Sequence, residues 1–98
     1  MFGDKFYITV DKHINNSKEN INSIENALDN NNAKKLEQAS HSLTGTSGQF
    51  GATVLSELAE QMELFAVNAE FDKAKELFPA LKSEREKVEE LMLLEINP

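Results

Sequence analysis

The sequence predicts an all-α protein: an antiparallel four-helix bundle with a short additional N-terminal helix. Apolar residues recur at spacings of three and four along most of the chain, which is the period of an amphipathic helix. The segments between these runs are only a few residues long, so consecutive helices are expected to run in opposite directions. The length of 98 residues suits one small domain, and we assign residues 1–98 to it, with a core over about 6–94.

The N-terminal part is predicted to form two helices. Phe6, Val10 and Ile14 recur at intervals of four residues and indicate a short helix over residues 6–14. Ser17 is a suitable N-cap for a second helix, because its hydroxyl can accept from the free N–H groups of the first turn. The apolar positions of that helix are Ile21, Ile24 and Leu28. It ends in residues 29–32, DNNN, a run that favours a turn.

The next two helices are separated by a glycine. One is predicted from Ala33, with Asn31 or Asn32 as its N-cap, and it is broken at Gly51. Its apolar positions are Leu36, Ala39, Leu43 and Phe50. The following helix is predicted from about Ala52 to Val67, before a turn at residues 68–70. Its apolar positions are Leu55, Leu58, Met62 and Phe65.

The last helix contains a proline. It is predicted to begin near Phe71, with apolar positions at Ala74, Phe78, Leu81, Val88, Leu91 and Met92. Pro79 lacks a backbone N–H and its ring crowds the preceding turn, so a kink or a short break is expected around residues 77–79.

Composition narrows the classes of function. The net charge of −7 argues against binding to nucleic acid or anionic membranes, which are recognised by Lys and Arg. We therefore expect a protein partner or a small ligand. There is no cysteine, no apolar run of about 18 residues and no signal peptide, which together indicate a cytoplasmic location. A monomer is expected, because the apolar faces are used within one bundle.

One histidine falls on the polar face of a predicted helix. On a helical wheel of about 100° per residue, Leu36, Leu43 and Phe50 form the core stripe, and His41 lies about 140° away. Gly45 and Gly48 share the face of His41, although each glycine in a helix costs about 0.5–1 kcal/mol relative to alanine. Two interpretations remain open. Without Cβ atoms, another molecule could approach the imidazole closely, or residues 44–48 are a fraying helix end or a loop.

An exposed imidazole has several possible roles. Near neutral pH it can act as a nucleophile, a general base or a metal ligand, or it can simply be solvated. The other histidine, His13, lies on a different element and no cysteine is present, which argues against a zinc site. No Ser-His-Asp arrangement or carboxylate pair stands out among the 17 Asp and Glu residues. We therefore predict no metal site and no cofactor.

The residues around His41 resemble the central motif of the histidine-containing phosphotransfer (HPt) family of two-component phosphorelays, H-x-L-K-G-S/A-S/A-x-x-x-G-A. The matching positions are His41, Leu43, Gly45, Gly51 and Ala52, with Thr46 and Ser47 in place of the two small residues. The segment from Leu55 to Glu63 also fits, as L-x-x-L-A-x-x-M-E, and an Asp/Asn-rich turn lies upstream. The resemblance covers residues 6–94, approximately the whole chain.

The resemblance implies a function. HPt domains are four-helix bundles whose exposed histidine accepts a phosphoryl group from the aspartate of one response-regulator receiver domain and passes it to another. His41 would be that acceptor. The expected partners are receiver domains and a hybrid sensor kinase, with Mg²⁺ bound only in the receiver. The protein would not be an enzyme with its own ATP site, and no Gly-rich nucleotide loop is present.

Residues near His41 on the polar side are expected to contact the partner: Gln38, Thr44, Gly45, Gly48 and Gln49. The sequence departs from the family motif at two of its positions. Thr44 replaces a lysine and offers the phosphoryl oxygens no positive charge, and Ser40 replaces the alanine that the family usually has just before the histidine.

Two charged residues upstream of His41 bear on the same site. Glu37 lies one helical turn before His41, close enough to interact, although an ordinary solvated glutamate is the simpler interpretation. Lys34 lies about 10.5 Å before His41 along the axis and is too distant to neutralise a phosphoryl group.

Two other functions compete with phosphotransfer. The first is an HPt-like bundle that binds receivers or acts as a scaffold without transfer, which the replacement of the lysine by Thr44 favours. The second is a hydrolytic or metal-dependent helical enzyme, which the absence of ligand clusters opposes. Phosphate on His41 that is acid-labile and alkali-stable would distinguish transfer from binding alone.

Overall fold

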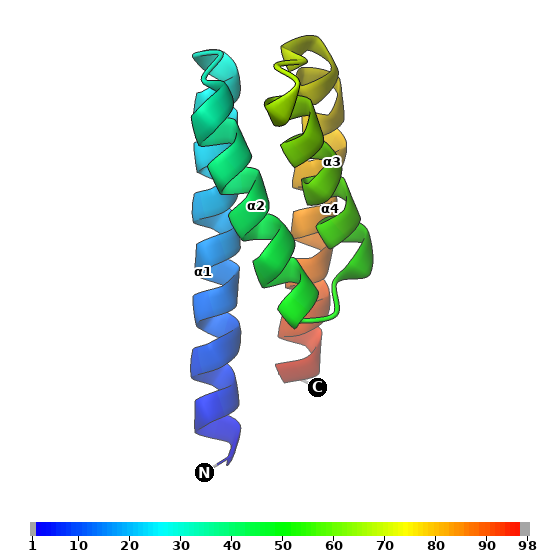
Figure 1. Cartoon of the computed structure of the whole chain (residues 1–98). Coiled ribbons are helices and arrows are strands. Elements are labelled where there is room, and N and C mark those ends of the chain that lie inside the picture. The colour runs from blue at the N-terminus through cyan, green and yellow to red at the C-terminus, as the bar shows by residue number, and fades with distance from the viewer. Residues whose placement is uncertain (1, 97–98) are drawn as a thin grey trace.

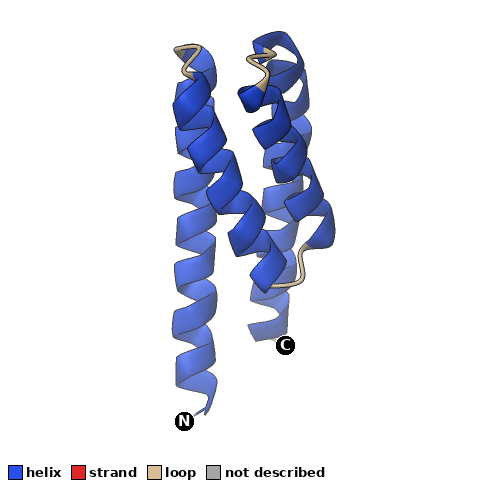
Figure 2. Cartoon of the chain, viewed as in Figure 1, coloured by secondary structure: helices blue, strands red, loops and turns tan. Residues whose placement is uncertain are grey.

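The structure, a computed structural model, describes the backbone of residues 2–96 and the side chains of residues 10–94. It contains four helices: α1 (Phe2–Asp29), α2 (Ala33–Gln49), α3 (Thr53–Val67) and α4 (Phe71–Ile96). Figure 2 shows that short loops join them, and residues 2–96 contain no strand. The predicted all-α fold class is confirmed.

The helices form an antiparallel bundle (Figure 1). Each helix packs against the next along the chain, and α1 also packs against α4, which closes the ring. No Cα atom of α2 lies within 8 Å of one in α4, so the two helices lie on opposite corners of the bundle. The molecule is elongated, with extents of 46 × 19 × 18 Å. α1 and α4 extend past the loop between α2 and α3, at the end of the bundle where both termini lie.

The separate N-terminal helix over residues 6–14 is a wrong prediction. α1 is continuous from Phe2 to Asp29, and Ser17 lies in its interior instead of capping a second helix. The Ser17 hydroxyl donates to the carbonyl of Ile14 at 2.8 Å, as serine does within a helix. Val10, Ile14 and Ile21 are all buried on one stripe, so packing against the bundle keeps the helix intact. The side chain of Phe6 lies outside the described residues.

The loops agree with the turn signals in the sequence. Asn31 adopts a positive φ of 50°, and Asn32 caps α2 by accepting from the backbone N–H of Lys35 at 3.1 Å. Gly51, in the α2–α3 loop, has a φ of 72°, a conformation that glycine adopts without steric cost. The predicted cap and the predicted glycine break are therefore confirmed.

Of the kink or short break expected around residues 77–79, the break does not occur. α4 continues through this residue without interruption. Ala74 and Leu81, on either side of the proline, are both fully buried. Packing of these flanking turns against the bundle offsets the backbone hydrogen bond that proline cannot make.

The core draws on all four helices. Its largest fully buried side chains include Ile24 from α1, Leu36 and Leu43 from α2, Leu55 and Met62 from α3, and Leu81 from α4. Burying one such side chain stabilises the fold by about 1.5–3 kcal/mol. Leu36 and Leu43 confirm the predicted core stripe of α2. That stripe anchors one side of α2 and leaves the opposite side free.

Candidate functional site

The outer face of α2 presents the candidate residues to solvent. The side chain of His41 is 77% exposed. Gln38, Gly45, Gly48 and Gln49 are exposed, and Thr44 is half-buried. Leu36 and Leu43 hold the opposite side of the helix in the core, so this exposure follows from the periodicity of the sequence. α2 is helical through both glycines, which contradicts the alternative of a loop or a fraying end over residues 44–48.

His41 contacts a residue from the next helix. Its Nδ1 atom lies 3.0 Å from Oε2 of Glu63 in α3, a side chain that is 24% exposed. An ionised carboxylate has no proton to donate, so Nδ1–H is the donor. In the neutral imidazole the lone pair then lies on Nε2, which makes no contact with Glu63. The geometry therefore leaves one nucleophilic nitrogen available.

The antiparallel packing of α2 and α3 creates this pair. The Ser56 hydroxyl donates to the carbonyl of Thr44 at 3.0 Å, and a Cβ added to Gly48 would lie 3.8 Å from the same hydroxyl. These contacts align the two helices so that Glu63 reaches His41. Glu37, which the sequence suggested as a neighbour, borders the same hollow, but no hydrogen bond or ion pair joins it to His41 in the structure.

Sequence reasoning did not identify Glu63 as a site residue. Glu63 appeared only as the last residue of the motif in the following helix. A usable signal was present: Glu63 directly follows the core residue Met62, on a helix that the Gly51 turn folds back antiparallel to α2. Only a model of that packing would place it beside His41.

Thr44 directs its hydroxyl into its own helix. Its Oγ1 atom donates to the carbonyl of Ser40 at 2.9 Å. In this conformation the hydroxyl is committed to the backbone and faces no group bound at His41. Ser40 itself is fully buried, and its hydroxyl has no hydrogen-bond partner in the structure. The alanine expected at position 40 would fill that site without an unpaired polar atom.

Gly45 leaves open space one turn from His41. A Cβ added there would meet no atom within 4 Å. Packing within the bundle therefore does not require glycine at position 45. It leaves the backbone of α2 accessible beside the imidazole, as the close-approach interpretation requires.

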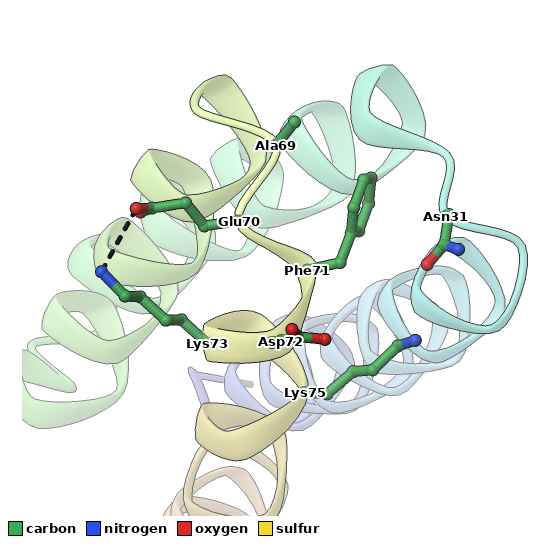
Figure 3. Close-up of a pocket in the computed structure, with 7 residues that line it drawn as sticks. All are labelled: Asn31, Ala69, Glu70, Phe71, Asp72, Lys73 and Lys75. Carbon is green, nitrogen blue, oxygen red and sulfur yellow. Dashed lines mark hydrogen bonds and ion pairs between the residues drawn. The ribbon is translucent and has the colours of Figure 1, made fainter.

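A shallow hollow of about 360 Å³ lies beside His41 and is lined by Lys34, Glu37, Gln38, His41 and Glu63. A larger hollow of about 430 Å³ lies at the end of the bundle where the α1–α2 and α3–α4 loops meet (Figure 3). Its lining residues are Asn31, Ala69, Glu70, Phe71, Asp72, Lys73 and Lys75. It includes no histidine, so its size does not indicate a reactive site.

Two further features of the described residues bear on function. They contain no group of three or more His, Cys, Asp or Glu side chains that could hold a metal ion. Within the same part of the chain, no helix has the length and apolar character that crossing a membrane requires.

The sequence matches the family model of the Hpt domain over residues 10–91. The chain belongs to the Hpt domain family. Its fold is also similar to the crystal structure of histidine-containing phosphotransfer protein B (HptB) from Pseudomonas aeruginosa PAO1, with a TM-score of 0.90 and 27% sequence identity. The similarity covers 95% of this chain and 81% of the HptB chain. No curated protein matches the sequence significantly.

Membership confirms the resemblance drawn from the motif around His41. The four-helix fold of this Hpt domain is the fold of its family. Hpt domains are phosphotransfer proteins that interact with receiver domains in phosphorelays, and this chain is a phosphotransfer protein of that kind.

Proposed function

We propose that His41 of this Hpt domain accepts a phosphoryl group from the aspartate of one response-regulator receiver and passes it to the aspartate of another. The observation that carries the proposal is the exposure of His41, 77%, combined with the contact of Glu63 on Nδ1. One ring nitrogen is held, and the other faces solvent with a free lone pair. A phosphoryl acceptor needs this combination.

In the proposed reaction, the Nε2 lone pair of His41 attacks the phosphorus of the receiver's acyl phosphate. The bond between phosphorus and the aspartate oxygen breaks, and the carboxylate leaves with the electron pair. Nε2 carries no proton in this tautomer, so none has to be removed. Nδ1 keeps its proton, and the Glu63 carboxylate, 3.0 Å away, stabilises the positive charge that develops on the ring. The reverse attack by a second aspartate completes the relay.

The partner supplies the rest of the site. Transfer between aspartate and histidine depends on positioning and charge neutralisation. We expect the receiver to bring the Mg²⁺ ion, and we assign no cofactor to this chain. Gln38, Thr44, Gly45, Gly48 and Gln49 are proposed as contacts to the receiver. We propose that the domain acts as a monomer in the cytoplasm, where receivers act.

Thr44 favours a second candidate function. The Thr44 hydroxyl bonds to the carbonyl of Ser40, and no lysine follows His41 by three residues. A domain of this kind could bind a receiver without forming phosphohistidine. We prefer transfer, because Glu63 and the free Nε2 atom serve a chemical step that binding alone does not need.

The test incubates the purified domain with receivers charged by acetyl phosphate and Mg²⁺. We expect acid-labile, alkali-stable phosphate on the wild type and none on His41→Gln. Equal label on His41→Gln would refute the assignment of His41. A receiver complex that forms without labelling would establish the binding function instead.

The same assay tests Thr44. Thr44→Lys is expected to slow hydrolysis of the phosphohistidine about tenfold, because an ammonium beside the phosphoryl oxygens adds a charged hydrogen bond. An unchanged lifetime would show that the residue at position 44 does not contact the phosphoryl group.

A further inference from the structure

The charges of the chain are unevenly distributed. All ten Lys and Arg residues lie before Leu36 or after Phe71. The segment between these residues forms most of α2 and all of α3, and its charged residues are all acidic: Glu37, Glu57, Glu60, Glu63 and Glu70. The surface around His41 is therefore mainly acidic, and Lys34 is a basic residue that also lines the hollow beside it.

The acidic residues of α3 lie on the side that continues from His41. Ser56 and Glu63 both contact α2, which identifies the edge of α3 next to the histidine. Glu60 and Val67 fall on the same edge, since the positions 56, 60, 63 and 67 follow a helical repeat of three and four. Glu57 and Leu64 lie on the outward side, one turn away from Glu60.

Two apolar side chains on this surface are uncovered. Leu64 is 56% exposed and Val67 is 60% exposed. Leu64 follows Glu63 directly, and Val67 lies one turn beyond it, so both are near the His41–Glu63 pair. We refer to Glu57, Glu60, Leu64 and Val67 together as the α3 docking surface. Leu64 and Val67 lie in the C-terminal part of α3, and Glu57 and Glu60 precede them along the helix. Exposed apolar side chains beside charged ones are common in protein–protein interfaces.

We propose that the α3 docking surface binds a part of the receiver that carries basic and apolar side chains and lies beside the receiver's phosphorylated aspartate. This inference rests on the proposed function and names the chemistry of the partner. Leu64 and Val67 supply contact area, and the carboxylates select a partner that carries Lys or Arg around its active site. Attraction between the carboxylates of the α3 docking surface and basic residues of the receiver accelerates association of the two proteins. Repulsion by the same carboxylates disfavours receivers with an acidic surface.

The experiment uses the receiver that labels His41 fastest in the assay above. The double variant Glu57→Lys/Glu60→Lys reverses two exposed charges, and the matched control Glu76→Lys/Glu86→Lys makes the same change on exposed positions of α4. We expect the second-order rate constant of transfer to fall about tenfold or more in the α3 variant and to change less than about twofold in the control. Raising NaCl from about 50 mM to about 300 mM should slow the wild type about tenfold and the α3 variant much less.

A second set of variants tests the apolar side chains of the α3 docking surface. Leu64→Ala/Val67→Ala should raise the Kd for the receiver about tenfold, while Val54→Ala, at the other end of α3 and 54% exposed, should leave it unchanged. Circular dichroism would verify that each variant folds. If transfer to His41 persists but is insensitive to salt and equal in both charge-reversal variants, the inference is refuted and the proposed function stands. If no receiver labels His41, the proposed function itself fails.

Discussion

At the scale of the residue, Glu63 determines which nitrogen of His41 is free. Its carboxylate accepts from Nδ1, and the 3.0 Å distance is that of an ordinary hydrogen bond. Free histidine exchanges between two neutral tautomers, and only one of them has its lone pair on Nε2. The contact with Glu63 selects that tautomer and limits rotation of the exposed ring. Glu63 is thus a positioning residue for the proposed transfer.

Loss of the Glu63 side chain should slow transfer. We expect Glu63→Ala to reduce the rate of His41 phosphorylation about tenfold, and Glu63→Gln to restore part of it, because the amide oxygen can still accept from Nδ1–H. Imidazole ¹⁵N shifts should show a mixed tautomer population in Glu63→Ala. Glu76→Gln on α4 is the control. An unchanged tautomer population in Glu63→Ala would contradict this role.

At the scale of the element, α2 contains glycines that its own packing does not need. A Cβ at Gly45 would meet open space, and at Gly48 it would meet Ser56 at an ordinary contact distance of 3.8 Å. Alanine therefore fits at both positions of the free protein. The glycines lower the stability of the helix and keep its outer surface flat, which favours contact with a partner.

Gly45→Ala should separate stability from transfer. We expect the free energy of unfolding to rise by about 0.5–1 kcal/mol, because alanine is the better helix former. Transfer should fall about tenfold, since the new methyl group stands where the receiver approaches. Urea denaturation and the labelling assay measure the two effects. Gly51→Ala is the contrasting variant: its φ of 72° should make alanine destabilising by about 1 kcal/mol.

α1 contributes a pH-sensitive contact. His13 is buried, and its ring lies 3.8 Å from that of Phe50 at the end of α2. Burial lowers the pKa of His13 below its ordinary value of 6.5. The unfolded chain therefore takes up this proton at a higher pH than the folded chain does. The contribution of His13 to stability is therefore fully present above pH 6.5, and it is lost as the pH falls through 6.5 toward the lower folded pKa.

The variant His13→Phe keeps an aromatic ring against Phe50 and removes the titration. Between about pH 7.5 and about pH 5.5, the wild type should lose more free energy of unfolding than His13→Phe does. Urea denaturation at several pH values gives the comparison, in which the carboxylates common to both proteins cancel. Parallel pH profiles would show that His13 binds protons equally in both states.

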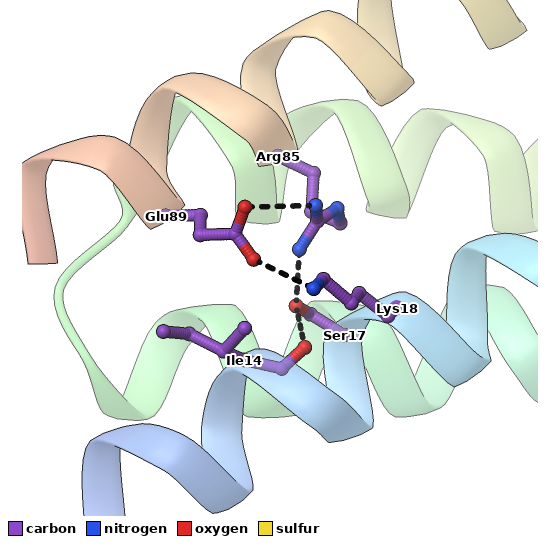
Figure 4. A network of polar contacts seen from close by, with 5 residues as sticks. All are labelled: Ile14, Ser17, Lys18, Arg85 and Glu89. Atoms are coloured by element: carbon purple, nitrogen blue, oxygen red, sulfur yellow. Dashed lines mark hydrogen bonds and ion pairs between the residues drawn. The ribbon is translucent and has the colours of Figure 1, made fainter. Parts of the chain in front are cut away.

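At the scale of the whole molecule, a polar network joins the first helix to the last (Figure 4). The Arg85 guanidinium, 8% exposed, donates to the Ser17 hydroxyl at 3.1 Å and lies 3.6 Å from the Glu89 carboxylate. Lys18 pairs with the other oxygen of Glu89 at 3.3 Å. A buried guanidinium needs these partners, because an unpaired buried charge is strongly destabilising. The network therefore helps hold α1 against α4.

Glu89 and Lys18 should contribute unequally to the free energy of unfolding. Glu89→Ala leaves Arg85 without its carboxylate and should lower the free energy of unfolding by about 2 kcal/mol. Lys18→Ala should cost less than about 1 kcal/mol, since the Lys18 side chain is 53% exposed and its ion pair is screened by water. Urea denaturation of both variants measures the two losses of unfolding free energy. Equal losses would show that Arg85 does not depend on Glu89.

The boundaries of the helices show where prediction from sequence succeeds. Asn32, one of the two candidate N-caps, and the break at Gly51 are confirmed, because capping and a positive φ depend on local chemistry. The N-cap at Ser17 and the break at Pro79 were wrong predictions, because each rests on a local signal for a helix boundary. Both lie inside long helices whose flanking residues are buried, and tertiary packing exceeds these local preferences.

By itself, the sequence determined the helical periods, the core stripe of α2 and the exposure of His41 on the opposite face, since all three depend only on residue spacing along one helix. Only the tertiary structure decided that Glu63, not Glu37, contacts His41, and that Arg85 bonds to Ser17. These partners are far apart in the chain. Their contacts depend on the register between packed helices, which no single helix encodes.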